Sequence, residues 1–276
     1  MPTVSPHLGA RRAAAVTALL VATLPAPPLR AQAAPPRGPL LTGRDLAVLG
    51  TAAAGAAVLA PFDTRIARWS QRPALHRSRP VNAVAAGLRA LGDPGTVLIG
   101  GATYAIGLAA DRRATAAVGL HTIGAVAAGG LVTTVIKAGV GRARPYVTHD
   151  SAAFDVGFGR GLRRGNDYQS FPSGHATAAF AFAGALAAEG RHRWREVNRA
   201  TGPAGFAVAG LVAASRVYHD RHWTSDVVAG AGIGAVAGAA VVRYARSHPE
   251  NRASRRLLPG RAVAPPRPIA SWTLTF

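Results

Sequence analysis

The sequence predicts an all-α protein, a bundle of six helices that crosses a membrane several times. Its 276 residues are 49% hydrophobic, and 32 of them are glycine. Long uncharged runs of alanine and glycine are typical of helices that pack closely through small residues. Within these runs, no alternation of apolar and polar residues is long enough to indicate β-strands. Six apolar segments, each bounded by proline, glycine or charge, are expected to form the helices: 46–60, 94–110, 114–136, 175–188, 200–214 and 227–242.

The lengths of these segments leave two architectures open. Several are shorter than the roughly 20 residues that a membrane-spanning helix needs. Either flanking residues lengthen the helices, or the bundle is soluble. Between the first two segments, residues 62–93 carry apolar side chains at a spacing of three and four, which predicts an amphipathic helix along the surface.

The N-terminus has the pattern of a secretory signal peptide or membrane anchor. Arg11 and Arg12 precede the apolar stretch 13–24, and Ala31-Gln32-Ala33 fits a small-x-small cleavage site. We expect the tail to be poorly ordered, because it is rich in arginine and proline. The predicted organisation is a signal or anchor, a linker, a helical domain and this tail, at residues 1–33, 34–41, 42–246 and 247–276.

The charge balance indicates anionic partners. The formal net charge is +20, which favours anionic lipid headgroups or phosphate substrates. Nucleic acid is not expected as a partner, because the arginines are spread along loops with few aromatic residues between them. Lys137 is the only lysine among the 32 basic residues, and a lysine gives a compact point charge where an arginine gives a planar fork. The chain has no cysteine, which excludes a disulfide framework and a thiolate metal site.

A short stretch at the start of the fourth apolar segment predicts a phosphate site. Ser173 is placed as the N-cap of a helix that begins with Gly174 and His175. The free N–H groups and the dipole at a helix N-terminus favour a bound phosphate. His175 lies in that first turn, where it can exchange a proton with a bound anion.

Cations are expected to reach the same spot from two other segments. Lys137 and Arg144 are seven residues apart, or two helical turns if the helix persists. Glycines interrupt that helix, and Pro145 biases Arg144 toward an extended conformation at a helix end. Arg216 supplies a third cation. Three cations around one spot repel each other unless an anion lies between them.

His222 and Asp226 form a candidate catalytic pair. They are four residues apart, on one side of a helix start that Thr224 or Ser225 is expected to cap. An aspartate that accepts from one ring nitrogen fixes the tautomer and leaves the other nitrogen free to attack. Asp226 is also a favourable charge at a helix N-terminus, and the two roles are compatible.

The three clusters together match the pattern K-x6-R-P, P-S-G-H and S-R-x5-H-x3-D at every defining position. Over roughly 41–246, the chain resembles the type 2 phosphatidic acid phosphatase (PAP2) superfamily, which includes class A acid phosphatases and vanadium haloperoxidases. The resemblance implies a six-helix bundle of that type and a phosphohistidine mechanism without a metal or other cofactor. It implies His222 as nucleophile, Asp226 as its orienting group, and His175 as the acid and later the base. The phosphoryl oxygens would be held by Lys137, Arg144, Ser173, the Gly174 N–H and Arg216.

The expected function is hydrolysis of phosphate mono- or diphosphate esters of lipids, such as phosphatidic acid or an isoprenoid diphosphate. The partners are then the phosphorylated lipid or small-molecule phosphate and the membrane lipids. Three alternatives remain: a soluble exported acid phosphatase of broad specificity, a vanadium haloperoxidase, and a non-catalytic membrane scaffold. A scaffold has no need of two histidines, and the chain lacks large insertions, which weighs against a haloperoxidase.

The topology signals conflict. A cleaved signal followed by three spans would place the three clusters inside the cell. The positive-inside rule instead makes the opposite end cytoplasmic, because Arg112, Arg113 and the 191–199 loop lie there. The 62–93 connection, however, carries arginines on the cluster side. We expect an inner-membrane protein with an extracytoplasmic active site, with a soluble periplasmic or secreted protein as the alternative.

Two histidines outside the pattern are expected to have other roles. His121 lies within an apolar segment and is expected to be a paired core residue. His219 lies between Arg216 and His222 and is expected to line the site. The loop 146–171 either gates the pocket, contacts the substrate or is an ordinary surface loop.

Overall fold

A computed structural model describes residues 39–249 and 251–258. The predicted signal or anchor at 1–33 and most of the predicted linker lie outside this range. The described residues form helices and no β-strand, and a single β-bridge joins Arg142 to Val156. The all-α prediction is confirmed.

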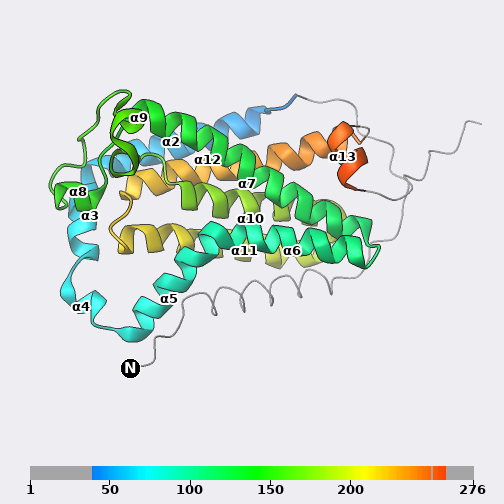
Figure 1. Cartoon of the computed structure of the whole chain (residues 1–276), viewed down its shortest axis with the longest axis horizontal. Helices are drawn as coiled ribbons and strands as arrows, with labels where there is room; N and C mark the ends of the chain where they lie inside the picture. The colour runs from blue at the N-terminus through cyan, green and yellow to red at the C-terminus, as the bar shows by residue number, and fades with distance from the viewer. Residues whose placement is uncertain (1–38, 250, 259–276) are drawn as a thin grey trace, which may run out of the picture.

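Each of the six predicted apolar segments corresponds to one long helix of the bundle, although 46–60 and 94–110 extend one or two residues beyond theirs (Figure 1). Most of these helices extend beyond the apolar segment: α7 has 28 residues, and α10, predicted from the 14 residues 175–188, has 20. Flanking residues therefore lengthen these helices, which is what the membrane-spanning architecture required. The six are α2 (Gly43–Leu59), α6 (Thr96–Ala109), α7 (Arg113–Val140), α10 (Gly174–Arg193), α11 (Arg195–Tyr218) and α12 (Thr224–Ser247).

Three helical stretches are long and apolar enough to cross a membrane: Gly43–Ser70, Arg113–Val140 and Thr224–Ser247. Their outward faces carry exposed apolar side chains such as Val58, Leu131 and Val135. Exposed apolar side chains along a long helix suit a lipid environment, where they need no cover.

Small residues set the distance between the helices. α10 and α12 form the most extensive pair in the bundle. A Cβ on Gly238 of α12 would lie 2.5 Å from the carbonyl oxygen of Ala181 in α10. This distance is too short for any side chain at position 238. On the neighbouring turns, Ala181 and Ala185 are fully buried beside Val242. The alanine- and glycine-rich sequence thus lets the two backbones approach closely.

The connection between α2 and α6 forms short helices at one end and along one side of the bundle (Figure 1). The amphipathic helix expected within 62–93 is α5, which packs on α11 through Leu88 and exposes Val81 and Val84. The connection consists of η1 (Ala60–Phe62), α3 (Asp63–Ser70), α4 (Pro73–His76), α5 (Arg79–Ala90) and η2 (Leu91–Gly95).

Part of the predicted tail is ordered, so the expectation of disorder is wrong for residues 251–258. Asn251 caps α13 (Arg252–Leu257) by accepting from the Ser254 N–H at 2.8 Å. Tyr104 of α6 donates to the Leu257 carbonyl at 2.5 Å, and Arg113 of α7 donates to the Leu258 carbonyl at 2.6 Å. These contacts hold the segment against the bundle.

The antiparallel course of the helices brings the three clusters to one end. The C-terminal ends of α7 and α11 meet the N-terminal ends of α10 and α12 there (Figure 1). The loop between α7 and α10 covers this end with three short helices, α8 (Pro145–Thr148), α9 (Arg160–Arg164) and η3 (Gly165–Tyr168).

Candidate active site

A cavity of about 460 Å³ lies at this end and is lined by residues of all three clusters. The volume falls within the range typical of small-molecule sites. No aspartate or glutamate is among its lining residues, which are Ala86, Arg89, Lys137, Arg144, Asn166, Gly174, His175, Arg216, His219, Arg221 and His222.

Lys137 lies in the last turn of α7. The helix ends at Gly141, whose left-handed φ of 60° suits glycine and whose N–H donates to the Lys137 carbonyl at 3.2 Å. The Lys137 ammonium donates to the Gln169 carbonyl and lies 3.4 Å from the Ser170 carbonyl oxygen. The loop before α10 therefore holds the only lysine of the chain at the cavity wall.

Arg144 leaves the helix as its proline neighbour predicts. Its backbone is extended (φ −77°, ψ 156°) and it precedes Pro145, the first residue of α8. Asn166 accepts from Nε and from NH2, each at 2.7 Å, and the Arg221 carbonyl accepts from NH1 at 2.9 Å. Because three hydrogen bonds fix the guanidinium, its remaining face is pre-oriented toward the cavity.

Ser173 is the N-cap of α10, as predicted, and its Oγ accepts from the Ala176 N–H at 3.4 Å. Gly174 and His175 follow in the first turn and line the cavity. Ser173 itself is fully buried and does not line the cavity. The structure therefore places Ser173 in support of the helix N-terminus and leaves the backbone and His175 facing the cavity.

His222 lies between the cavity and Asp226. Its Nδ1 is 3.6 Å from Asp226 Oδ2, an ion-pair distance longer than a hydrogen bond, and its Nε2 is 3.3 Å from Arg144 NH1. A proton on Nδ1 faces the carboxylate, which leaves the Nε2 lone pair toward the guanidinium and the cavity. The His222 ring is only 2% exposed.

Burial controls the charge of His222. It lowers the pKa of the ring to about 3; the charges of Lys137 and Arg144 act in the same direction, and Asp226 opposes them. At neutral pH the ring is therefore neutral and keeps a free lone pair on one nitrogen. A neutral imidazole is the form that attacks phosphorus.

The expected cap of α12 is wrong. The N-cap is Trp223, and neither Thr224 nor Ser225 caps the helix with its side chain. Asp226 Oδ2 instead accepts from the Trp223 N–H at 2.9 Å, and Asp63 Oδ1 accepts from the Ser225 N–H at 2.9 Å. Carboxylates satisfy these donors better than hydroxyls, because their charge complements the helix dipole.

Two residues that the sequence did not single out, Arg142 and Asp63, hold Asp226 in place. Arg142 NH1 lies 2.6 Å from Asp226 Oδ1, and NH2 lies 2.8 Å from Asp63 Oδ2. Ser170 Oγ donates to Asp226 Oδ2 at 2.5 Å. Arg142 lies between Lys137 and Arg144, within the x6 gap of the first cluster. This position close to a signature arginine was the signal from which the sequence could have indicated a role at the site. Asp63 is 162 residues from Ser225 and carried none.

Arg216, in the last turn of α11, brings an uncompensated charge to the cavity. It is 5% exposed, and its Nε and NH1 are buried without a hydrogen-bond partner among the described residues. A buried guanidinium with unpaired N–H groups is costly unless a ligand satisfies them. Its donors therefore fit a bound oxyanion.

The other histidines behave as expected. His121 is buried, and its Nδ1 pairs with Glu189 Oε1 at 2.6 Å within the bundle. His219 lines the cavity, with its Nδ1 2.6 Å from the Ser215 carbonyl oxygen. From the loop 146–171, Asn166 lines the cavity as well.

A helical bundle whose end carries two histidines and three signature cations around one cavity is the arrangement that the resemblance to the PAP2 superfamily implies. Residues 119–249, a little under half of the chain, match the family model of the PAP2 superfamily.

Two relatives and a solved structure are also similar to this chain. The chain is 40% identical over 83 residues to a lipid A 1-phosphatase of Porphyromonas gingivalis, covering 29% of this chain and 17% of that protein. It is 34% identical over 118 residues to a lipid A 1-phosphatase of Rhizobium johnstonii, covering 43% and 44%. The match thus spans less than half the length of either relative. The fold is similar to a transmembrane PAP2-type phosphatidylglycerolphosphate phosphatase from Bacillus subtilis, with a TM-score of 0.53, 21% identity and coverage of 72% and 94%.

Proposed function

We propose that the protein hydrolyses phosphate or diphosphate esters of lipids through a phosphohistidine, without a metal. The observation that carries the proposal is the cavity itself, which His175 and His222 line together with Lys137, Arg144 and Arg216. Catalysis of phosphoryl transfer depends mainly on a nucleophile positioned in line with the leaving oxygen and on cations that neutralise the phosphoryl oxygens. The cavity supplies both.

In the proposed reaction, Nε2 of His222 attacks phosphorus and the ester P–O bond breaks. Asp226 stabilises the positive charge that the ring gains, as the buried carboxylate on the Nδ1 side. Burial and the surrounding cations lower the pKa of His175 to about 3, so its ring is neutral in the free enzyme and takes up a proton together with the phosphate anion. His175 then gives this proton to the leaving oxygen and takes one from the water that breaks the N–P bond. Inorganic phosphate is released, and both rings return to their starting state.

Three cations and the start of α10 would hold the phosphoryl oxygens. Lys137, Arg144 and Arg216 neutralise charge on the oxygens, and the Gly174 N–H belongs to the free donors of the helix N-terminus. Arg144 and Lys137 are already fixed by hydrogen bonds to Asn166 and to the Gln169 carbonyl. The site therefore pays little reorganisation as charge moves in the transition state.

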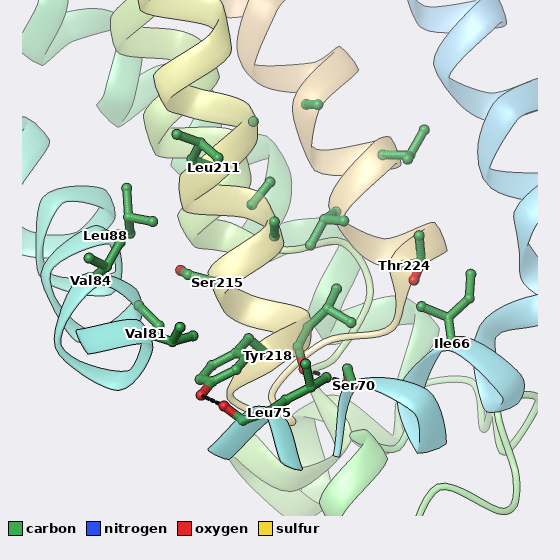
Figure 2. Close-up of a pocket in the computed structure, with 18 of the residues that line it drawn as sticks. Ile66, Ser70, Leu75, Val81, Val84, Leu88, Leu211, Ser215, Tyr218 and Thr224 are labelled. Atoms are coloured by element: carbon green, nitrogen blue, oxygen red, sulfur yellow. Dashed lines mark hydrogen bonds between the residues drawn. The ribbon is translucent and has the colours of Figure 1, made fainter. Parts of the chain in front are cut away.

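A second, apolar cavity supports a lipid substrate. A groove of about 820 Å³ lies between α3, α5, α11 and α12, and Figure 2 shows side chains such as Ile66, Val84 and Leu211 around it. Two of its hydroxyl groups bond elsewhere: Ser70 Oγ donates to the Ala67 carbonyl at 2.8 Å, and Ser215 Oγ to the Val212 carbonyl at 2.7 Å. The hydroxyl of Thr224 is buried without a partner among the described residues. Such a surface suits a hydrocarbon chain.

The apolar groove adjoins the charged cavity. On α5, Leu88 lines the groove and the next residue, Arg89, lines the charged cavity. On α11, Ser215 lines the groove and Arg216 lines the charged cavity. We assign the groove to the acyl or isoprenoid chain of the substrate whose phosphate occupies the cavity. A broad-specificity acid phosphatase has no use for it.

We also propose that the protein lies in the inner membrane with the cavity on the extracytoplasmic side. The turns at the opposite end carry Arg112, Arg113 and Arg195, which supports a cytoplasmic location of that end, whereas the arginines of the 62–93 connection at the cavity end are the opposing signal. The chain has no cysteine, so a single introduced one is a clean label. A membrane-impermeant maleimide should label Arg164→Cys but not Arg195→Cys in intact cells. The reverse pattern would invert the topology, and recovery in the soluble fraction without detergent would reject the membrane assignment.

Activity on a substrate panel tests the proposed chemistry. The full chain in detergent should release phosphate from phosphatidic acid or farnesyl diphosphate in the presence of EDTA, and vanadate should inhibit it. Faster turnover of p-nitrophenyl phosphate than of either lipid would favour the broad-specificity enzyme. Loss of activity in EDTA, restored by a divalent metal, would contradict the metal-free mechanism.

A further inference from the structure

Two arginines outside the three clusters, Arg89 and Arg221, line the same cavity as the signature cations. From them we infer a second anion subsite beside the one for the reacting phosphoryl group, and hence a lipid diphosphate as the preferred substrate. The inference rests on the proposed function, and it narrows the substrate from phosphate esters in general to esters with two adjacent phosphates.

Arg89 reaches the cavity from α5. Its charge acts on His175, Arg216 and His219, which places it beside the leaving-group acid. It makes no hydrogen bond or ion pair with a residue that the structure describes, and it is exposed. A guanidinium that faces a cavity of like charges without a carboxylate partner is poised for an anionic ligand.

Arg221 reaches the cavity from the turn between α11 and α12, and it is exposed. Its N–H donates to the Arg216 carbonyl at 3.0 Å, and its own carbonyl accepts from Arg144 at 2.9 Å. Its guanidinium lies over the ring of Tyr146, 4.8 Å from the centroid. The stacking restricts the side chain at low entropic cost and leaves its N–H edge for a ligand.

The charge balance exceeds what one phosphate can offset. Five cationic side chains line the cavity, and no carboxylate does. Asp93 and Asp220 act on Arg216 and Arg221 from nearby, but neither lines the cavity. A phosphate monoester carries about −1.5 to −2 charge near neutral pH. A second phosphate adds negative charge to the ligand, so that the ligand offsets more of the positive charge of the cavity.

The position of Arg89 fits the chemistry of a diphosphate. Nε2 of His222 attacks the terminal phosphorus, and the bond from that phosphorus to the bridging oxygen breaks. The bridging oxygen keeps the electron pair, takes a proton from His175 and leaves on the lipid monophosphate, whose remaining charge lies near Arg89. Water then breaks the N–P bond, giving inorganic phosphate and a proton that passes to His175.

Binding of two hydrolysis-resistant probes tests the subsite without relying on turnover. We expect the full chain in detergent to bind methylenediphosphonate at least about tenfold more tightly than methylphosphonate, the effect of about one charge-assisted hydrogen bond. Arg89→Gln and Arg221→Gln should each reduce this ratio several-fold. Arg79→Gln, an exposed arginine on α5 that does not line the cavity, should leave it unchanged. Equal affinity of the wild type for the two probes would overturn the inference.

Kinetics on paired substrates separates this inference from the function on which it rests. The wild type should have a higher kcat/KM for farnesyl diphosphate than for farnesyl monophosphate, and Arg89→Gln should lower only the diphosphate value by about tenfold. Equal losses on both substrates would overturn the second subsite. Inorganic pyrophosphate should be a poorer substrate than farnesyl diphosphate, because it leaves the apolar groove unused. Preferential binding of methylenediphosphonate without hydrolysis of either ester would reject the hydrolase and retain the subsite.

Discussion

One carboxylate oxygen of Asp226 lies 2.6 Å from the guanidinium of Arg142, while the other lies 3.6 Å from the ring of His222. Arg142 also binds Asp63 at 2.8 Å, so one buried cation joins two buried carboxylates. Asp226, the partner of His222, is thus held by Arg142 and Asp63, neither of which lines the charged cavity. This arrangement fixes the side of the imidazole that carries the proton.

Removal of Arg142 should destabilise the fold. Arg142→Gln leaves the carboxylates of Asp63 and Asp226 buried without their cation, and breaking a buried pair in this way costs about 3–5 kcal/mol. The measurement is the free energy of unfolding, or the thermal midpoint, in one detergent. Arg199→Gln removes an exposed ion pair with Glu196 and should cost ~0–1 kcal/mol. Equal midpoints for the two variants would show that the network carries no stability.

Asp226→Asn should lower kcat by roughly 10²–10⁴-fold, because a neutral amide no longer stabilises the positive ring of His222. KM should change much less, since Asp226 does not line the cavity. Glu196→Gln, at an exposed site on α11, is the matched control and should keep the wild-type kcat. A higher KM with an unchanged kcat would assign Asp226 to substrate binding instead.

Stability should depend on pH through Asp220. Burial, and then the facing carboxyl of Asp150, raise the pKa of Asp220 to about 7, while Arg221 opposes the shift. The folded state therefore holds a proton that the unfolded state releases near pH 4. The stabilisation is present at low pH and is lost as pH rises through about 7.

The thermal midpoint of the wild type should accordingly fall between pH 5 and pH 8 by more than that of Asp220→Asn. Asparagine suits the left-handed backbone at this position, where φ is 58°. Asp111→Asn, in an exposed turn with φ 51°, controls for the substitution and should keep the wild-type pH dependence. If Asp220→Asn had the same pH profile as the wild type, Asp220 would not be the group that holds this proton.

Close packing of α10 on α12 predicts a contrast between two glycines. Gly238→Val places a side chain within 2.5 Å of the Ala181 carbonyl and should cost about 1–3 kcal/mol or more through overpacking. Gly101→Ala, in α6 with nothing within 4 Å, should be neutral or stabilise by up to ~1 kcal/mol. Thermal unfolding of both variants checks this, and a stable Gly238→Val would mean that the helices separate easily.

Local chemistry made most of the fold predictable. Proline and glycine mark helix ends in any context, so Ser173, Gly141 and Pro145 lie where their backbone preferences require. The fixed spacing of the three clusters predicted that Lys137 and His222 would share a cavity, because the pattern has meaning only if distant segments meet. The roles of these side chains remain proposals.

Long-range contacts could not be predicted in the same way. Arg142 meets Asp63 across 79 residues, and nothing local to Asp63 signals a partner. Arg89 lies in an amphipathic helix whose rotation about its axis depends on packing against α11. The sequence likewise could not distinguish a Ser173 that faces the cavity from one buried behind it. Such contacts depend on how helices dock, which periodicity alone does not specify.

Trapping of the covalent intermediate tests the central claim most directly. Rapid acid-free quenching of the wild-type enzyme with a lipid diphosphate, followed by peptide mass spectrometry, should locate a phosphoryl group on the His222 imidazole. His222→Ala should show no adduct and no turnover. A phosphoryl group on His175, or a His222→Ala enzyme that still releases phosphate at the wild-type rate, would contradict the account.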